Sequence, residues 1–310
     1  MEFFEDSKPV KGMIFMGCSF TWGQGLWYYS YSPTVIEDKP YQFNPSLLNE
    51  SHHKFKDSRR FARLVADHFD TYEIVHPKNG AAHDQMVEFW TACFSAKYGV
   101  RSLVKGFNYD YNSRSLDTIP LEILEADQPH MVDRAMPLDY KDISHVVFQF
   151  THWSRDRIKL PYSGKEVEIK IGNSWGKDSQ YNNALVDLLI EENKDLGQLN
   201  QELLEKSVNN VKNFLQGLES KGIKTYTISY PEDVAECAKK DEWFKERFID
   251  IEYQDNTYQS FESLMKAVPE MEVIGDTKNF KVPPQDGHPS LECNRVVAKN
   301  IIDRIERDNK

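Results

Sequence analysis

A serine and a histidine near opposite ends of the chain stand in contexts that suit nucleophilic catalysis. Ser19 lies in IFMGCSFTWGQG, residues 14–25, where apolar residues lead into Gly-Cys-Ser and then into two more glycines. His288 lies in DGHPS, and Asp286 stands two positions before it. A serine attacks a carbonyl at neutral pH when a histidine takes its proton, and a carboxylate commonly orients that histidine. These three residues are therefore a candidate nucleophile, base and orienting acid.

Alternating strands and helices are expected to position this chemistry. Short apolar runs predict strands at 12–16, 72–75, 145–150, 224–230 and 248–252. Apolar residues at helical spacing predict helices at 57–69, 81–98, 183–219, 233–248 and 291–308. Asp57 or Ser58 is expected to cap the first of these helices, and Ser290 the last. The helix at 183–219 is expected to break near 195–197. This order implies an α/β fold with a parallel sheet covered on both faces, whose sites lie at the carboxyl ends of the strands.

The chain of 310 residues, 40% of them apolar, is long enough for a sizeable core. We expect one domain, 1–310, with insertions at about 20–56, 100–142 and 158–182, the last able to hold a hairpin because KEVEIKI alternates. The insertions are expected to shape the substrate pocket.

The net charge of −11 disfavours nucleic acid and anionic membranes as partners, since both attract basic surfaces. No secretory signal and no run of about 20 apolar residues is visible, so a cytoplasmic location is expected, with association with a virion or particle left open. The four cysteines lack CxxC spacing, which predicts neither a metal site nor a disulfide framework. The most economical role for Cys18 is a small apolar core residue.

Taken together, GCSFTWG after the first strand and DGHPS before the last helix resemble the SGNH, or GDSL-type, hydrolase superfamily, in a branch that contains GCSFT. The resemblance implies a three-layer α/β/α sandwich with a mostly parallel, flavodoxin-like five-stranded sheet. It implies Ser19 as nucleophile, His288 as general base and Asp286 as orienting carboxylate. The oxyanion hole would combine the backbone N–H of Ser19 with Gly80, in KNGAAHDQM after the second strand.

Three features depart from the family pattern. The aspartate stands two rather than three residues before the histidine, so Asp276 or a Ser-His dyad remains an alternative. Cys18 replaces the usual Asp before the serine. The third block, Gly-x-Asn-Asp, is absent; the equivalent strand ends in FQFTHWSRDR, where His152 or the indole N–H of Trp153 is a substitute oxyanion donor.

Aromatic residues follow the serine in WGQGLWYYSYSP, residues 22–33. Trp22 and Trp27 can stack on sugars or line an acyl pocket, or they can pack the insertion onto the sheet. His83 and His152 are further candidates for lining the substrate cleft. GQG at 23–25 meets neither the dinucleotide fingerprint nor the Walker pattern, which argues against a phosphate loop.

The sequence thus predicts a serine esterase that removes a short acyl group, such as O-acetyl, from a glycan or small metabolite, without metal or organic cofactor. The alternative is a catalytically inactive SGNH-fold module, for example a carbohydrate-binding protein or a particle component. The oligomeric state is not indicated by the sequence.

Overall fold

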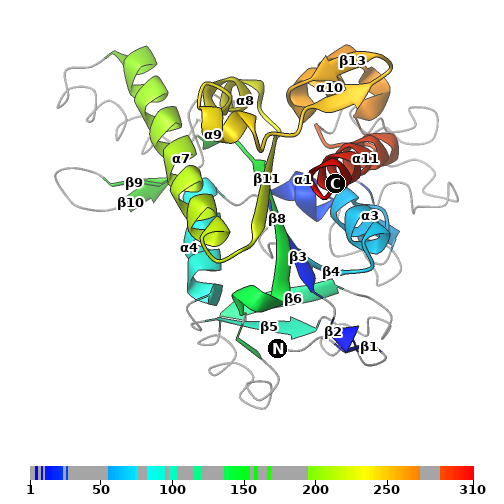
Figure 1. The fold of residues 1–310 in the computed structure, drawn as a ribbon. Coiled ribbons are helices and arrows are strands. Elements are labelled where there is room, and N and C mark those ends of the chain that lie inside the picture. The colour runs from blue at the N-terminus through cyan, green and yellow to red at the C-terminus, as the bar shows by residue number, and fades with distance from the viewer. Residues whose placement is uncertain are drawn as a thin grey trace, which may run out of the picture.

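The computed structural model describes residues 4–5, 8–9, 11–23, 26, 55–75, 82–94, 98–102, 115–120, 136–137, 139–153, 157–159, 166–168, 195–272 and 287–310. A sheet of seven described strands runs through the molecule (Figure 1). Its spatial order is β11 (Lys224–Ser229), β8 (Ile143–Phe150), β3 (Gly12–Met16), β4 (Tyr72–Val75), β6 (Ser115–Pro120), β5 (Tyr98–Ser102) and β7 (Met136–Pro137).

The strands β11, β8, β3 and β4 are paired in parallel, and β6 adds a parallel pair beside β4. The strands β5 and β7 complete the edge in antiparallel pairings. Three two-stranded ribbons accompany the sheet: β1 (Phe4–Glu5) with β2 (Lys8–Pro9), β9 (Arg157–Lys159) with β10 (Glu166–Glu168), and β12 (Ile251–Tyr253) with β13 (Asn256–Tyr258).

Helices cover both faces of the sheet (Figure 1). The described helices are α1 (Ser19–Trp22), α3 (Phe61–His68), α4 (His83–Phe94), α7 (Leu196–Glu219), α8 (Glu232–Ala238), α9 (Glu242–Lys245), α10 (Phe261–Ala267) and α11 (Leu291–Asp308), with 3₁₀ turns η5 (Tyr140–Asp142) and η7 (Pro269–Met271). The expected α/β class, with a parallel sheet between helices, is confirmed.

The period of two along β3 divides the core into two clusters. Ile14 and Met16 pack with side chains of α4, α7, α8 and α9 on one face. Met13 and Phe15 pack with α3, α10 and α11 on the other. Because both faces are buried, the strand reads as a continuous apolar run, which is how the sequence revealed it.

The predicted strands at 12–16, 72–75, 145–150 and 224–230 are confirmed within two residues. The fifth, 248–252, is wrong as a sheet strand. Phe248 forms one isolated parallel bridge to Thr227, and the chain then leaves the sheet to build the β12–β13 ribbon. Gln254 and Asp255, both at positive φ, form the tight turn of that ribbon.

Several helix boundaries also match. The terminal helix spans 291–308, and Ser290 caps it by accepting a hydrogen bond from the Cys293 N–H. Of the predicted helical region 183–219, the structure describes α7, which Asp195 caps at the expected break, and residues 183–194 lie outside the described residues. However, α3 begins at Phe61 with Arg60 as N-cap, so neither Asp57 nor Ser58 is its cap. The predicted helix 233–248 is divided into α8 and α9.

The three predicted insertions differ in how far the structure agrees with them. The pairing of β9 with β10 confirms a hairpin within the third insertion. Residues 100–142 are not simply an insertion, because β6, β7 and most of β5 belong to the main sheet. Most of 20–56 lies outside the described residues.

Candidate active site

Ser19 occupies the position expected for a nucleophile at the carboxyl edge of the sheet. It is the first residue of α1 and follows β3 after only Gly17 and Cys18. The side chain is 6% exposed, and its hydroxyl donates to Cys18 Sγ at 3.9 Å. The turn therefore presents the hydroxyl at the edge of a buried strand.

An amide from the neighbouring strand fixes this turn. Gln149, near the end of β8, is fully buried, and its Oε1 accepts from Thr21 N at 3.2 Å and from Thr21 Oγ1 at 2.7 Å. Its Nε2 donates to Phe150 O at 2.9 Å and to Cys18 Sγ at 3.5 Å. Gln149 thus saturates its own polar atoms while locking α1 against β8.

Gly17 is required by the same packing. A Cβ at this residue would collide with Thr21 Oγ1 and lie 2.6 Å from Gln149 Oε1. The small residue before the serine motif therefore allows the close approach of α1 to β8.

Buried charges support the far end of α1. Gly23 ends this helix at φ 80°, where an added Cβ would lie 3.0 Å from Arg60 Cβ. The Arg60 guanidinium binds Glu73 through Nε and Nη2, at 2.6 and 2.8 Å, and contacts Asp57 at 3.0 Å. Burial lowers the pKa of Lys56 to about 8, against the opposing effect of Asp57 3.0 Å away.

The loop that carries His288 is anchored on both sides. Glu272 Oε1 accepts from Gly287 N at 2.6 Å, and Ser290 N donates to Met271 O at 2.7 Å. Asn294 of α11 donates to Ser290 O at 2.9 Å and accepts from Phe61 N at 2.9 Å. The loop is therefore held by η7, by its own helix and, through Asn294, by α3.

The two distant motifs meet in space. The ring of Phe20, the residue after Ser19, stacks on the His288 imidazole with centroids 5.1 Å apart and planes inclined by 26°. Phe20 also stacks on Tyr230, with centroids 3.9 Å apart and planes inclined by 22°. The His152 ring meets Tyr230 edge-on at 5.2 Å. Residues that follow β3, β8 and β11 thus gather with His288 at one edge of the sheet.

His152 also lies near a carboxylate, that of Glu262. The pKa of Glu262 is lowered. Burial alone would raise it, but the Glu232 N–H and the Lys266 ammonium, with a contribution from His152, outweigh the effect of burial. The Glu262 carboxylate accepts from Glu232 N at 3.0 Å and pairs with Lys266 at 2.9 Å. This edge therefore carries a carboxylate, paired with a lysine, close to His152.

His83 and Trp153 are engaged elsewhere in the structure. Thr151 N donates to His83 Nε2 at 2.7 Å, so Nδ1 carries the proton and donates to Ser207 Oγ, also at 2.7 Å. His83 is fully buried and ties α4 to α7 and to the end of β8. The Trp153 indole N–H donates to Asp233 Oδ2 at 3.2 Å. Oxyanion contact by Trp153 and substrate contact by His83 stay predictions.

Other predicted site residues lie outside the described residues. These are Gly80, Asp286 and its alternative Asp276, and Trp27. Trp22 is placed only as a backbone position, the last residue of α1.

Sequence reasoning missed Gln149, Asn294 and Tyr230. A signal existed for each of them: Gln149 is a polar residue inside the apolar run HVVFQF, and Asn294 lies on the buried face of α11. Tyr230 follows its strand directly and precedes Pro231, at the sheet edge where sites form.

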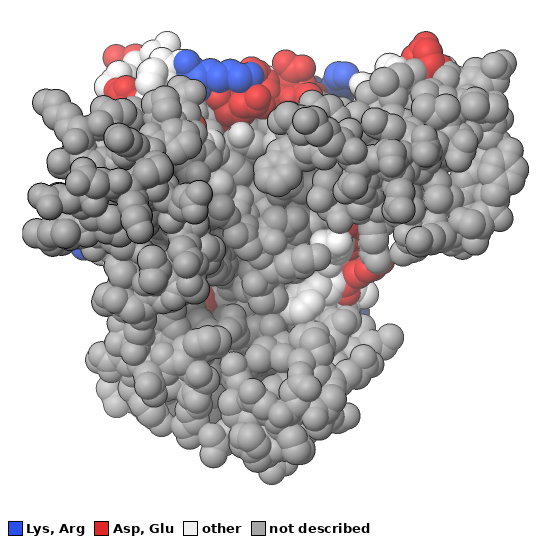
Figure 2. All heavy atoms as spheres, turned by 180° about the vertical axis from the view of Figure 1, so that it is seen from behind, with Lys and Arg blue, Asp and Glu red and all other residues white. Residues whose placement is uncertain are grey.

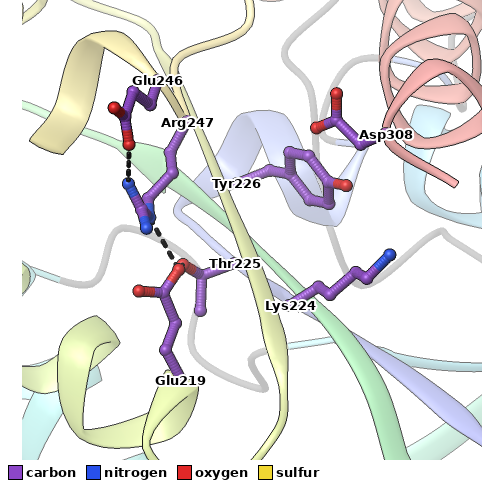
Figure 3. A pocket seen from close by; sticks show the side chains of 7 residues that line it. All are labelled: Glu219, Lys224, Thr225, Tyr226, Glu246, Arg247 and Asp308. Carbon is purple, nitrogen blue, oxygen red and sulfur yellow. Dashed lines mark hydrogen bonds and ion pairs between the residues drawn. The ribbon is translucent and has the colours of Figure 1, made fainter.

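A hollow of about 250 Å³ opens at the opposite end of β11 (Figure 3). Its polar groups bind within the protein: Glu219 accepts from Arg247 Nε at 2.6 Å and from Thr225 Oγ1 at 2.7 Å, and Lys224 donates to Asn309. The sites of α/β sheets form at the other edge, so this hollow is not the candidate active site.

Acidic and basic side chains alternate along the upper rim of the molecule seen from behind (Figure 2). None of the described helices is long and apolar enough to cross a bilayer. The described residues also hold no group of three or more His, Cys, Asp or Glu side chains arranged for a metal ion.

Comparison of the chain with family models, with curated proteins and with solved structures finds no match.

Proposed function

We propose that this chain is a serine hydrolase of the SGNH type that cleaves carboxylic esters. The observation that carries the proposal is the stacking of Phe20 on His288, because it places the residue next to Ser19 against the histidine of the distant DGHPS motif. Nothing in local sequence requires these two segments to meet.

The strand order supports a flavodoxin-like sheet. In chain order β3, β4, β8 and β11 are the first to fourth predicted strands, and in space they follow the order 2-1-3-4. The flavodoxin-like order is 2-1-3-4-5. The single bridge from Phe248 to Thr227 stands where the fifth strand of that order would lie, beside β11.

In the proposed reaction, Ser19 Oγ attacks the ester carbonyl while His288 removes its proton. The alcohol leaves with a proton from His288, and water then hydrolyses the acyl-enzyme with His288 again as base. Asp286 orients His288, and the N–H groups of Ser19 and Gly80 hold the oxyanion, with the indole N–H of Trp153 as the third donor once it leaves Asp233. Catalytic hydrogen bonds are often long in a free enzyme and shorten on substrate binding, and the Ser19–His288 bond is proposed to form in this way.

The proposed substrate carries a short acyl group, such as O-acetyl, on a glycan or a small metabolite. The rings of Tyr230 and His152 at the sheet edge support a site that takes a small flat group or a sugar face. Trp22 and Trp27 are proposed to extend this surface.

A second candidate, an inactive SGNH-fold binding module, is favoured by one observation. The Trp153 indole N–H, which is the proposed third oxyanion donor, is directed to Asp233 in this structure. Loss of one such donor typically costs about 100-fold or more in turnover.

A substrate screen separates the two candidates. Wild-type protein is tested against p-nitrophenyl esters of increasing acyl length and against acetylated sugars. We expect turnover that is highest for acetyl and falls by about 100-fold or more in His288→Ala. The exposed His68 provides the control His68→Ala, which should keep full activity. Saturable binding of acetylated sugars without any turnover would contradict hydrolysis and favour the binding module.

A further inference from the structure

We infer that Phe20 is a positioning residue for His288, so that the nucleophile and its base share one support. This inference rests on the proposed function and extends it: Phe20 takes no part in the bond-making and proton-transfer steps and acts through the imidazole.

The three rings form one stack. The Phe20 ring stacks both on the Tyr230 ring, at 3.9 Å and 22°, and on the His288 imidazole, at 5.1 Å and 26°. Phe20 is 4% exposed, so the packing around it leaves its ring little freedom. A near-parallel partner on one face restricts the tilt of the His288 ring, which is the degree of freedom that a general base must control.

The Tyr230 backbone, which carries the ring under Phe20, is itself fixed. Tyr230 N donates to Phe150 O at 3.0 Å, and Tyr230 O accepts from Glu262 N at 3.0 Å. The backbone of Tyr230 is thus tied to β8 on one side and to α10 on the other. A ring attached to this backbone provides a rigid surface for Phe20.

Phe20, the ring shared by both contacts, is joined to the nucleophile. Phe20 and Ser19 are consecutive residues of α1, and Gln149 locks this short helix through Thr21. A displacement of α1 would therefore move Ser19 and the His288 platform together. The separation between Ser19 and the Phe20 ring that supports His288 is preserved even when the DGHPS loop adjusts.

The stack also suits the charge that develops during the reaction. When His288 takes the proton of Ser19 it becomes an imidazolium, and a cation over an aromatic face is attracted by the ring quadrupole. An orienting carboxylate has the same two effects: it orients the histidine ring and stabilises the positive charge of the imidazolium. Phe20 therefore supplements the carboxylate, whose spacing from the histidine is shorter here than in the family pattern.

The test compares substitutions that remove or retain the ring. Phe20→Leu should lower kcat by about 10- to 100-fold with little change in KM, and Phe20→Tyr should restore most of it. Phe261→Leu is the matched control, because Phe261 is equally buried and lies 6.1 Å from Phe20 without a ring contact to His288 in this structure. Its kcat should stay within about twofold of wild type.

A double substitution shows whether Phe20 acts through His288. In a His288→Ala background, Phe20→Leu should change the residual rate, or the rate of fluorophosphonate labelling, by less than about twofold. A loss of the same size in both backgrounds would mean that Phe20 acts on the Ser19 turn, and would overturn the inference.

A measurement independent of activity covers variants that fold poorly or turn over slowly. With ¹³C-labelled histidine, the ring protons of His288 should show an upfield ring-current shift that Phe20→Leu removes and Phe20→Tyr keeps. A shift that is absent from wild type contradicts the stack. Wild-type turnover with an unaffected Phe20→Leu variant contradicts only the positioning role, whereas the absence of any wild-type turnover contradicts the proposed function and the inference with it.

Discussion

Gln149 binds Thr21 through two hydrogen bonds to one oxygen, from Thr21 N at 3.2 Å and from Thr21 Oγ1 at 2.7 Å. The two residues are 128 positions apart in the sequence and belong to β8 and α1. This contact joins the turn that presents Ser19 to the strand beside it. The rigidity of the proposed nucleophile therefore depends on a residue that takes no part in the chemistry.

Gln149→Met should destabilise the protein by about 2 to 4 kcal/mol, because it leaves two buried donors of Thr21 without an acceptor. Urea unfolding measures this loss. Gln201→Met is the control, since Gln201 is exposed and binds only Glu205 across one turn of α7; it should cost no more than about 0.5 kcal/mol. Equal effects of the two substitutions would show that the Gln149 contact contributes little.

Asn294 and Asn300 separate stability from function on one helix. Asn294 joins α11 to the His288 loop and to Phe61, and Asn300 makes similar bonds to the backbone of Glu252. Each change to Ala should cost about 2 to 3 kcal/mol in urea unfolding. Only Asn294→Ala should also lower kcat, by about tenfold, because it frees the loop that carries the base. An Asn300→Ala variant with the same kinetic defect would contradict this assignment.

Replacing only one member of the Arg60–Glu73 pair should destabilise the protein strongly, whereas replacing both members should not. Both side chains are buried, and burial raises the pKa of Glu73 against the opposing effect of Arg60. Glu73→Gln removes the carboxylate that binds the buried guanidinium through two nitrogens, leaves the contact with Asp57, and should destabilise by about 3 to 5 kcal/mol. The double variant Arg60→Met/Glu73→Leu should recover to within about 1 kcal/mol of wild type. A double variant as unstable as the single one would show that this pair is needed for more than charge balance.

His145 should make stability fall in mild acid. Its ring stacks on those of Phe69 and Tyr226, and neither ring nitrogen has a hydrogen-bond partner among the described residues. Burial, with Lys224 and Lys11 adding to it, lowers its pKa from 6.5 to about 4. Between pH 4 and pH 6.5, His145 is protonated in the unfolded chain but stays neutral in the folded chain. The contribution of His145 is therefore fully present above pH 6.5 and declines as pH falls toward 4, by about 2 to 3 kcal/mol in total.

Urea unfolding at several pH values between 4 and 7 measures this decline. His145→Phe should flatten the slope over the same window, because it removes the titrating group and keeps a ring beside the two aromatic neighbours. An identical slope in the variant would assign the acid sensitivity to other groups.

The comparison of sequence with structure separates local from long-range information. Residues 12–16 and 291–308 were predicted with their bounds, because a doubly buried strand and a capped amphipathic helix have strong local signals. The strands of the 100–142 region, β6 above all, were missed because they lie toward the edge of the sheet and lack clear periodicity. The prediction of a sheet strand at 248–252 failed because only Phe248 pairs with the sheet, in one bridge to Thr227, and Ile251 and Glu252 belong to the β12–β13 ribbon.

The chemistry of the candidate site follows the same division. Ser19 and His288 carry recognisable flanking motifs. The residues that hold them, Gln149 and Asn294, bind partners 128 and 233 positions away, and no local pattern reveals such a partner. The stack of Phe20 on His288 likewise depends on tertiary structure, because the two residues come from opposite ends of the chain.

The reactivity of Ser19 toward a fluorophosphonate tests the central claim most directly. Wild-type protein is incubated with the probe, and intact mass and peptide mapping locate the adduct. We predict one adduct, on Ser19, which Ser19→Ala abolishes, His288→Ala slows by about 100-fold or more, and the exposed Ser220→Ala leaves unchanged. Folded wild-type protein that remains unlabelled, or that is labelled at a residue other than Ser19, would contradict the account.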